Sequence, residues 1–429
     1  MLALAVAGCL SKPPFQGPLN DDAPRDGNGS GTLTGVSVLG NGLADPIAVT
    51  GTEFELHFPQ MGLSRITLPD RLTVGGVDVL GQLGGCSSED AVGLAIYPVL
   101  SLSAHESPTN ASSTPRVIAM GPAFAQVSVT WDAPFACPTT VLSATGTSTF
   151  TAFPDGRIVR DDRITPTTTM LAGGGAACGC GTASADYFVT SFLTLQDQYF
   201  NHMAWEDGLI HELVIPVPMP NDWIDQPNPG WVCLDGPEPS SGHRRVGITW
   251  PGPLPTSDTG GTRIKPNPAS TTLIYDWLYA APTVPTGERA TQSAWFVGTG
   301  ADATCDELTM APMASAFARP RQLSALVDGA SMMIALDQPT GIYVIDPITP
   351  AGNYSISVEV AVTGVPAGYA VSIVLASASP PRVTLGAVEL VVERDYLWQQ
   401  ASRMSGGFVH TLWIAQPLAQ GVQLAISAP

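Results

Sequence analysis

The densest group of residues suited to acid–base chemistry lies between Asn201 and Glu212, in the sequence NHMAWEDGLIHE. Two histidines, His202 and His211, and the carboxylate Glu212 flank a glycine-containing turn in strand-like sequence. Imidazole and carboxylate together can act as a general acid and base near neutral pH, or form part of a metal site. These three residues are the candidate catalytic groups. The alternative is that they are exposed side chains of an ordinary hairpin, and we favour it.

The register of this hairpin decides which groups meet. A two-residue turn at Asp207-Gly208 places His202 diagonally from His211 on one face, about 7–8 Å apart at Cα. A turn that begins at Glu206 places His202 opposite Glu212 instead. Either register gathers imidazole and carboxylate.

Three tryptophans are candidates for stacking on a ligand: Trp223, Trp231 and Trp250, in or beside a Pro-rich segment over residues 215–268. Exposed aromatic rings there could stack on sugars. Equally, they could attach long loops to the fold. The sequence leaves both interpretations open.

A second charged group, Asp161-Asp162 with Arg157, Arg160 and Arg163, could hold a ligand. We expect ion pairing between neighbouring strands instead, because these residues follow a hairpin turn.

Several classes of chemistry find no motif. The sequence has no G-x-S-x-G elbow, P-loop, H-E-x-x-H pair or G-x-G-x-x-G after a strand, so we predict no metal site and no cofactor. The charge balance is 18 basic against 37 acidic residues, a net charge of −19. No basic stripe exists, and nucleic-acid binding is therefore not expected.

The amino terminus is apolar or small from Met1 to Gly8 and ends in Val6-Ala7-Gly8-Cys9. These four residues resemble the lipobox of bacterial lipoprotein signal peptides. The resemblance implies cleavage after residue 8 and lipidation of Cys9. It also implies an outer-membrane lipoprotein of the cell envelope, facing the periplasm or the cell surface, since no Asp follows the cysteine. A basic n-region is missing, so we expect that the start is truncated or assigned too late.

Cysteine usage independently favours export. Apart from Cys9, six of the seven cysteines remain, an even number, and all six are disulfide candidates. Disulfides persist in oxidising compartments such as the periplasm. Cys178 and Cys180 are too close for an easy mutual bridge, and Cys137 is our first choice as partner for one of them. The disulfide candidates are Cys86, Cys137, Cys178, Cys180, Cys233 and Cys305.

Alternation of apolar and polar residues predicts strands from residue 33 onward, in runs bounded by the 44 glycines and 39 prolines. We predict an all-β chain: a large two-sheet antiparallel β-sandwich over 32–320, then a smaller β-sandwich over 321–429, with long Pro/Gly-rich loops. Residues 1–8 would be a signal peptide and 9–31 a flexible, lipid-anchored tether. Helical spacing is rare, with short candidates near Leu323–Asp328 and Tyr396–Met404.

One hairpin is strongly predicted, because Pro154-Asp155-Gly156 separates two alternating runs. With the strand-like stretch from Gly121 to Trp131, it resembles the strand pairs in the large β-sandwich modules of galactose-mutarotase-like proteins and polysaccharide lyases. The resemblance covers 121–164 and implies a broad sandwich in a carbohydrate-related setting. Such lyases often carry catalysis on a helical toroid, which this sequence lacks.

Three functions stay open. The first is a non-enzymatic envelope protein that binds a glycan or another envelope component, with its lipid anchor as the contact with the membrane. The second is a carbohydrate-active enzyme (lyase, epimerase or hydrolase) that uses the hairpin of His202, His211 and Glu212. The third is a purely structural surface protein. The sequence gives no oligomeric state.

Overall fold

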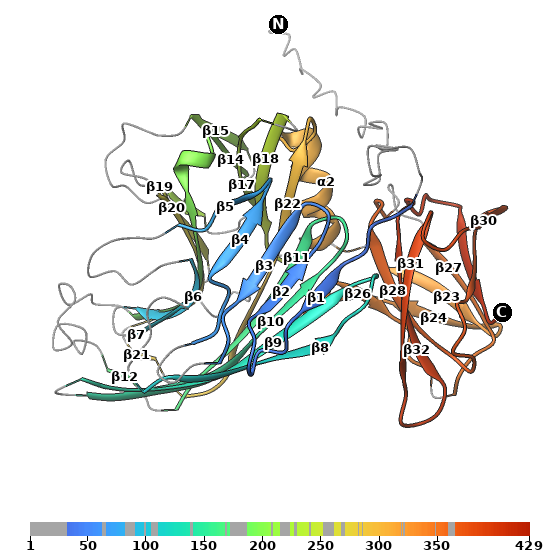
Figure 1. Cartoon of the computed structure of the whole chain (residues 1–429), viewed down its shortest axis with the longest axis horizontal. Helices are drawn as coiled ribbons and strands as arrows, with labels where there is room; N and C mark the ends of the chain where they lie inside the picture. Colours follow the sequence, from blue (N-terminus) through green and yellow to red (C-terminus); the bar gives the residue numbers. More distant parts are fainter. Residues whose placement is uncertain are drawn as a thin grey trace, which may run out of the picture.

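The computed structural model describes residues 32–61, 66–81, 91–97, 100–103, 110–137, 140–167, 170–171, 187–206, 209–214, 224–226, 230–239, 242–251, 261–266, 271–281, 283–284, 286–318, 320, 322–347, 349–358 and 365–429. These residues confirm the all-β fold class: almost all regular structure is strand, and nearly all pairing is antiparallel (Figure 1). One α-helix, α2 (Glu307–Ala318), and one 3-10 turn, η1 (Asp197–Tyr199), occur in this part. Neither is long and apolar enough to cross a membrane.

The largest sheet has nine strands in the order β15-β14-β17-β18-β22-β11-β10-β9-β8. Their bounds are β8 Ser112–Ala119, β9 Ala125–Cys137, β10 Thr140–Ala152, β11 Arg157–Pro166, β14 His202–Glu206, β15 Ile210–Val214, β17 Trp231–Glu238, β18 Gly242–Thr249 and β22 Arg289–Gly300.

The opposing layer is made of two sheets. A five-stranded sheet contains β1 Ser37–Leu39, β2 Ile47–Thr50, β3 Phe54–Phe58, β4 Arg71–Val74 and β5 Val77–Asp78. A six-stranded sheet, in the order β16-β19-β20-β13-β6-β7, contains β6 Val92–Tyr97, β7 Leu100–Ser103, β13 Tyr187–Gln196, β16 Ile224–Gln226, β19 Gly261–Pro266 and β20 Thr271–Ala281. A bridge between Leu80 and Leu195 joins the two. A further pair is β12 Met170–Leu171 with β21 Thr283–Val284.

The large core fills the space between these layers. Phe150 of the nine-stranded sheet meets Phe58 of the opposing layer edge-on at 5.3 Å, and Trp295 at 6.0 Å. Alternation explains why, because every second residue of β9 and β10, where the side chains are described, points inward and is apolar or small.

An ion pair lies inside this core. Arg160 and Asp162 are 3% and 0% exposed, and Arg160 Nε lies 2.5 Å from Asp162 Oδ2. The Arg160 guanidinium also donates to the carbonyl oxygens of Phe192 (3.0 Å) and Gly93 (2.7 Å) in the six-stranded sheet. One charged side chain therefore fixes the two layers relative to each other.

The C-terminal residues form two further sheets with their own core. One has the order β24-β23-β27-β33-β29-β30: β23 Leu323–Val327, β24 Ala330–Ile334, β27 Asn353–Val358, β29 Arg382–Leu385, β30 Val388–Leu390 and β33 Gln423–Ser427. The other has the order β25-β26-β28-β32-β31: β25 Leu336–Asp337, β26 Ile342–Val344, β28 Tyr369–Leu375, β31 Tyr396–Ser402 and β32 Phe408–Ile414. We call residues 322–429 the C-terminal part. Its status as a separate domain, with a boundary near Pro320, stays a prediction.

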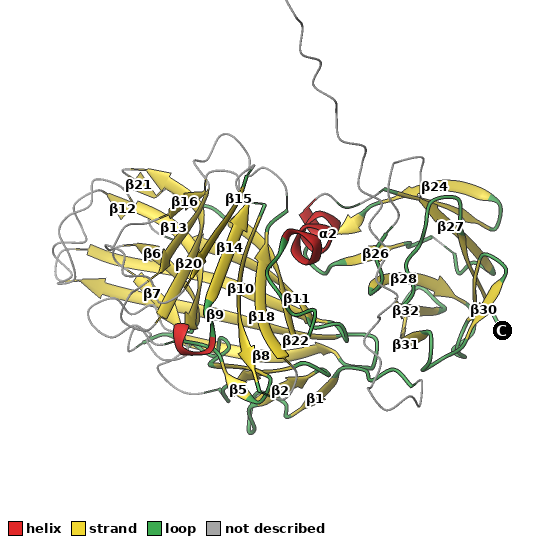
Figure 2. Cartoon of the chain, turned by 90° about the horizontal axis from the view of Figure 1, so that it is seen from above, coloured by secondary structure: helices red, strands yellow, loops and turns green. Residues whose placement is uncertain are grey.

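Helix α2 lies between the nine-stranded sheet and the C-terminal part (Figure 2). Met310 and Phe317 of α2 share one apolar cluster with Phe296 of β22 and Trp413 of β32. The β10–β11 turn adds a polar contact, since Arg157 donates to the carbonyl oxygen of Gly368 (2.8 Å). Helix α2 and the C-terminal part thus cover the outer face of the large sheet at β17, β18, β22 and the β10–β11 turn.

Several local predictions need correction. The segments near Leu323 and Tyr396 are strands, because each pairs with neighbouring strands of a C-terminal sheet. In the sheet that contains Leu323, β29 and β30 form a hairpin that reverses at Gly386, whose φ of 59° suits glycine.

The helix that does form was not predicted. Asp306 caps it by accepting a hydrogen bond from the backbone N–H of Thr309 (2.8 Å). Pro312 lies inside this helix, and a proline in the interior of a segment argues against a helix in a sequence-based prediction.

The predicted β10–β11 hairpin is present, with Ala152 paired to Ile158. A two-residue Asp-Gly turn needs a positive φ at both residues. Here Gly156 has a positive φ (79°) and Asp155 does not, so the turn is of another type. Gly156 N–H donates to the carbonyl oxygen of Phe153 (3.2 Å). A type I turn followed by a left-handed glycine closes the hairpin.

Candidate functional site

The outer face of the nine-stranded sheet carries rows of hydroxyl side chains on β8 to β11. Outward positions on four neighbouring strands pair as Thr114–Thr130–Thr147–Arg163. The next row is Ser112–Asp132–Thr145–Thr165. Since alternate residues of β9 are buried and exposed, both rows share the solvent face.

These rows line a shallow hollow of about 440 Å³. We call it the hydroxyl hollow; it is lined by Ser112, Ser113, Thr114, Thr130, Trp131, Asp132, Thr145, Gly146, Thr147, Arg163, Thr165 and Glu288. Its volume is within the range of small-molecule sites. Hydroxyl groups both donate and accept hydrogen bonds, so the hollow suits a neutral ligand that carries many hydroxyls.

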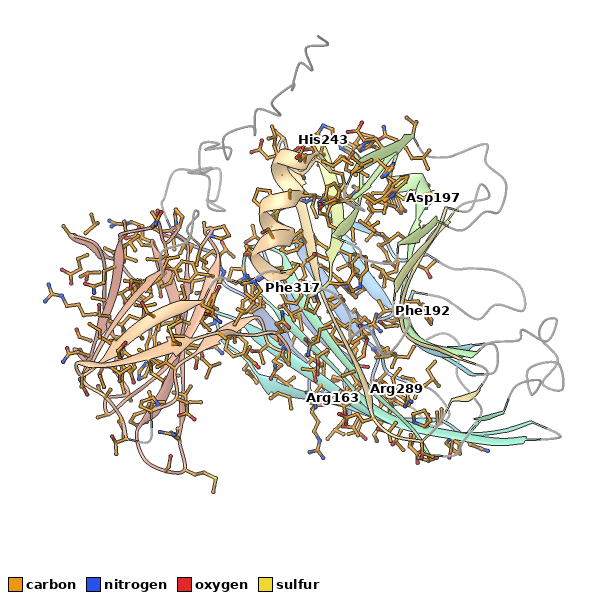
Figure 3. The ribbon with its side chains drawn as sticks, turned by 180° about the vertical axis from the view of Figure 1, so that it is seen from behind. Arg163, Phe192, Asp197, His243, Arg289 and Phe317 are labelled. Atoms are coloured by element: carbon orange, nitrogen blue, oxygen red, sulfur yellow. A yellow bond between two sulfur atoms is a disulfide. The ribbon has the colours of Figure 1, made fainter. Side chains whose placement is uncertain are left out.

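Arg163 is the fixed cation of the hollow, on the outer side of the long strands (Figure 3). Its Nε donates to Asp161 Oδ2 (3.1 Å), and Nη1 lies 3.6 Å from Glu288 Oε1. The hydrogen bond and charge of Asp161 raise the pKa of Arg163, so this group stays protonated. Asp161 is itself held by Gln292 Nε2 (2.9 Å). The guanidinium is therefore oriented while its side chain remains 45% exposed.

The predicted catalytic hairpin adopts neither expected register. Trp205 pairs with His211 and Ala204 with Glu212, so the turn contains three residues from 207 to 209. His202 therefore pairs with Val214.

The consequence is that the two histidines lie on opposite faces. His211 stacks on the Trp205 ring at 5.1 Å, facing the large core. His202 and Glu212 share the outer face, where Glu212 is exposed. The two-residue turn, which would gather both imidazoles, is wrong, because one extra turn residue moves every side chain of β15 to the other face. The other register expected His202 directly opposite Glu212; the two share a face, with His202 paired to Val214 instead.

His202 has a different partner. Its Nδ1 lies 3.1 Å from Asp235 Oδ2, a buried carboxylate on β17. The same oxygen accepts the backbone N–H of Cys305 (2.6 Å). A buried carboxylate at Nδ1 would fix the ring and leave Nε2 as a base, with the side chain 28% exposed.

Arg245 stands beside Asp235 in the next strand. It donates to the carbonyl oxygens of Asp302 (3.2 Å) and Thr304 (3.3 Å), in the segment that leads into α2. Burial lowers the pKa of Arg245 to about 10. The polar group around Asp235 therefore holds the start of α2 against the sheet, which is a structural role.

The structure shows the pairing of two of the six disulfide candidates. Cys233 and Cys305 are bonded, with Cα atoms 5.5 Å apart. Cys86, Cys178, Cys180 and the lipidation candidate Cys9 lie outside the described residues, and for Cys137 only the backbone is described.

The tryptophan candidates for stacking require a correction. Trp231 and Trp250 are 1% and 2% exposed and belong to apolar clusters, so neither presents a ring to a ligand. Trp223 lies outside the described residues. The alternative, that aromatic rings attach these segments to the fold, matches the two described side chains.

The arginine–aspartate group on β11 differs from expectation in part. The pair of Arg163 with Glu288, just before β22, reaches the neighbouring strand as expected. Two other ion pairs join residues two apart on one strand, Arg160 with Asp162 and Arg163 with Asp161. Alternation sends the first pair inward and the second outward. Only the outer pair reaches the hydroxyl hollow.

Sequence reasoning did not single out the hydroxyl rows, although their signal was present. The alternating run of β9 predicts a strand, and its outward positions include Ser128, Thr130 and Asp132. Among the described residues no three His, Cys, Asp or Glu side chains gather as a metal site.

Comparison with known proteins assigns no family to this chain. No protein-family model and no curated protein matches the sequence. One solved structure similar to this chain is the GalM/aldose epimerase homologue from C. elegans. It is 12% identical, the match covers 62% of this chain and 100% of that chain, and the TM-score is 0.30. At that TM-score we draw no functional argument from the likeness.

Proposed function

We propose that this protein is a non-enzymatic, lipid-anchored envelope protein that binds a glycan through the hydroxyl hollow. The observation that carries the proposal is the pair of hydroxyl rows beside the oriented Arg163. A neutral polyhydroxylated ligand can exchange hydrogen bonds with every threonine of these rows. The guanidinium adds donors of fixed direction.

Two observations support the proposed cellular location of the protein. Val6-Ala7-Gly8-Cys9 supports lipidation of Cys9 in an outer-membrane lipoprotein that faces the periplasm or cell surface. The Cys233–Cys305 bond supports folding in an oxidising compartment.

The test begins with a glycan array probed with the full chain. Thr130→Val combined with Thr147→Val removes two hydroxyls from the hollow and keeps the side-chain shape. We expect affinity for the array hits to fall about tenfold or more, because two hydrogen bonds are lost. Thr73→Val, on an outward position of the five-stranded sheet, is the matched control and should bind as the wild type does. Equal affinity of all three proteins would remove the hollow from the binding site.

An enzymatic function is the second candidate, favoured by the contact between His202 Nδ1 and Asp235 Oδ2. A glycan bound nearby could then lose a proton to His202 Nε2, with Glu212 on the same face. Incubation of array hits with the protein should give no product if the protein only binds. Product that disappears in the His202→Ala/Glu212→Ala variant would establish the enzyme instead. A purely structural protein would bind nothing on the array.

A further inference from the structure

The first described residues run along the edge of the nine-stranded sheet that β8 forms. The backbone at Gly35 lies against Pro122, and that at Gly42 lies against Pro115. Val36 N–H donates to the carbonyl oxygen of Pro122 (3.1 Å). Residues 35–42, which include β1, therefore run antiparallel to the second half of β8 (Figure 1).

Large aliphatic side chains gather along this edge. The antiparallel course brings Leu39 beside Ile118, and Met61 N–H donates to the carbonyl oxygen of Gly42 next to Leu43. Ile118 is the extra residue of a β-bulge, which turns its side chain out of the sheet pattern. We call the following residues the apolar corner: Leu39 (69% exposed), Leu43 (59%), Met61 (45%), Ile118 (56%) and Met120 (65%).

Charged residues are few around the apolar corner. Residues 33–44 and 117–131 contain no Asp, Glu, Lys or Arg, although the protein has a net charge of −19, and the charged residues next to these stretches on the corner side are Asp45 and Arg116, both exposed. A surface with few charged groups leaves water at a low cost of desolvating ions. Exposed apolar patches of this kind mark sites of interaction with proteins or membranes.

We propose that the apolar corner rests on the surface of a phospholipid bilayer. The argument for a lipid partner is where the described chain begins. The chain enters the fold at Thr32, seven residues before Leu39, and the lipidation candidate Cys9 lies on the same amino-terminal side. This inference rests on the lipid anchor of the proposed function. The anchor holds the protein at the membrane, and the corner sets its orientation there.

Orientation matters for the hydroxyl hollow. Strand β8 carries Ile118 of the corner near one end and Ser112 of the hollow at the other. Six residues of extended strand separate them by about 20 Å. Gly42, beside the corner, lies against Pro115, which adjoins Thr114 of the hollow. With the corner on the lipid, the hollow therefore begins close to the bilayer surface at Thr114 and extends away from Ile118.

The test uses the full chain with Cys9→Ser, so that any binding to lipid is independent of the anchor. Its probe is flotation with phosphatidylcholine vesicles. Leu39→Ser, Ile118→Ser and Met120→Ser together should lower the partition onto vesicles about tenfold or more, because each apolar side chain contributes through burial. The matched control replaces three exposed aliphatic residues of the C-terminal part, Leu326→Ser, Met333→Ser and Met404→Ser. This control should float as the Cys9→Ser parent does.

Three outcomes would overturn the proposal. They are a parent that does not float, equal losses in the corner and control variants, and self-association that depends on the corner in sedimentation. The last would assign the surface to a second copy of the chain. Mass measurement of the wild type separately tests the anchor. A wild type without lipid would remove the anchor of the proposed function, whereas the flotation result for the corner would stand.

Discussion

The two main cores of this protein handle buried polarity in different ways. Among the described residues, the large sandwich buries charged side chains on both its faces: Arg160, Asp161, Asp162, Asp197, Asp235, Glu238, Arg244 and Arg245. The C-terminal part buries Ser372, His410 and Thr411. Its single buried titratable base is a histidine, which can enter a core uncharged.

The difference follows from the way each core is closed. The large sandwich faces one nine-stranded sheet with two smaller sheets, and arginines bridge the layers: Arg160 reaches Phe192, and Arg244 Nε donates to the Val74 carbonyl oxygen (3.0 Å). The C-terminal core is closed by aliphatic and tyrosine side chains. A broad sandwich therefore uses directional contacts to position its layers, and a small one relies on packing.

The largest expected effect comes from Arg160→Met. It leaves the Asp162 carboxylate buried without its cation and should cost about 3–5 kcal/mol of unfolding free energy. Urea unfolding measures the loss. Adding Asp162→Leu should restore much of it, since no charge is then stranded. If the double variant were as unstable as Arg160→Met alone, the stability contributed by Arg160 would not come from neutralising the Asp162 charge.

Removing the disulfide should have the next largest effect. Replacing Cys233 and Cys305 by Ala opens a closed loop with a sequence separation of 72 and should cost about 2–4 kcal/mol. Calorimetry should show the large sandwich unfolding at a lower temperature. The C-terminal part, which does not contain the bond, should keep its own transition unless the shared cluster around α2 couples the two.

His410 should make the C-terminal part sensitive to acid. Burial lowers the pKa of His410, whose Nε2 donates to the carbonyl oxygen of Ser377 (2.7 Å). The neutral ring therefore contributes stability above the unfolded pKa of about 6.5, and this contribution is lost as the pH falls through the lower folded value. His410→Gln keeps a donor and removes the titration. Its unfolding midpoint should depend less on pH in that window, and an unchanged slope would exclude His410 as the cause.

The smallest effect on stability is expected for Arg163→Met. Asp161 is buried but keeps its hydrogen bond from Gln292, and the Arg163 side chain is 45% exposed, so unfolding free energy should fall by about 1–2 kcal/mol. Glycan affinity should nevertheless fall, because the hollow loses its oriented donor. Arg71→Met, which removes an exposed pair with Glu55 on another sheet, is the control. A stability loss as large as that of Arg160→Met would erase the distinction between inner and outer pairs.

Alternation in the sequence was enough to predict the fold class and the β10–β11 hairpin, because a two-residue period and an Asp-Gly turn are local signals. The hairpin of His202 and His211 could not be predicted correctly. One turn residue decides which face each histidine takes, and that choice depends on Trp205 packing into a distant core. The His202–Asp235 and Arg160–Phe192 contacts join residues about 30 positions apart. No local pattern encodes such pairs.

The strands that carry the hydroxyl hollow have a mechanical consequence. β9 and β10 pair in register over all thirteen residues of each, from Cys137–Thr140 to Ala125–Ala152. Tension along these strands is shared by the whole ladder of hydrogen bonds at once, whereas tension across a strand end would open them one after another. A force that a bound ligand applies along β9 and β10 would therefore have to break these hydrogen bonds together.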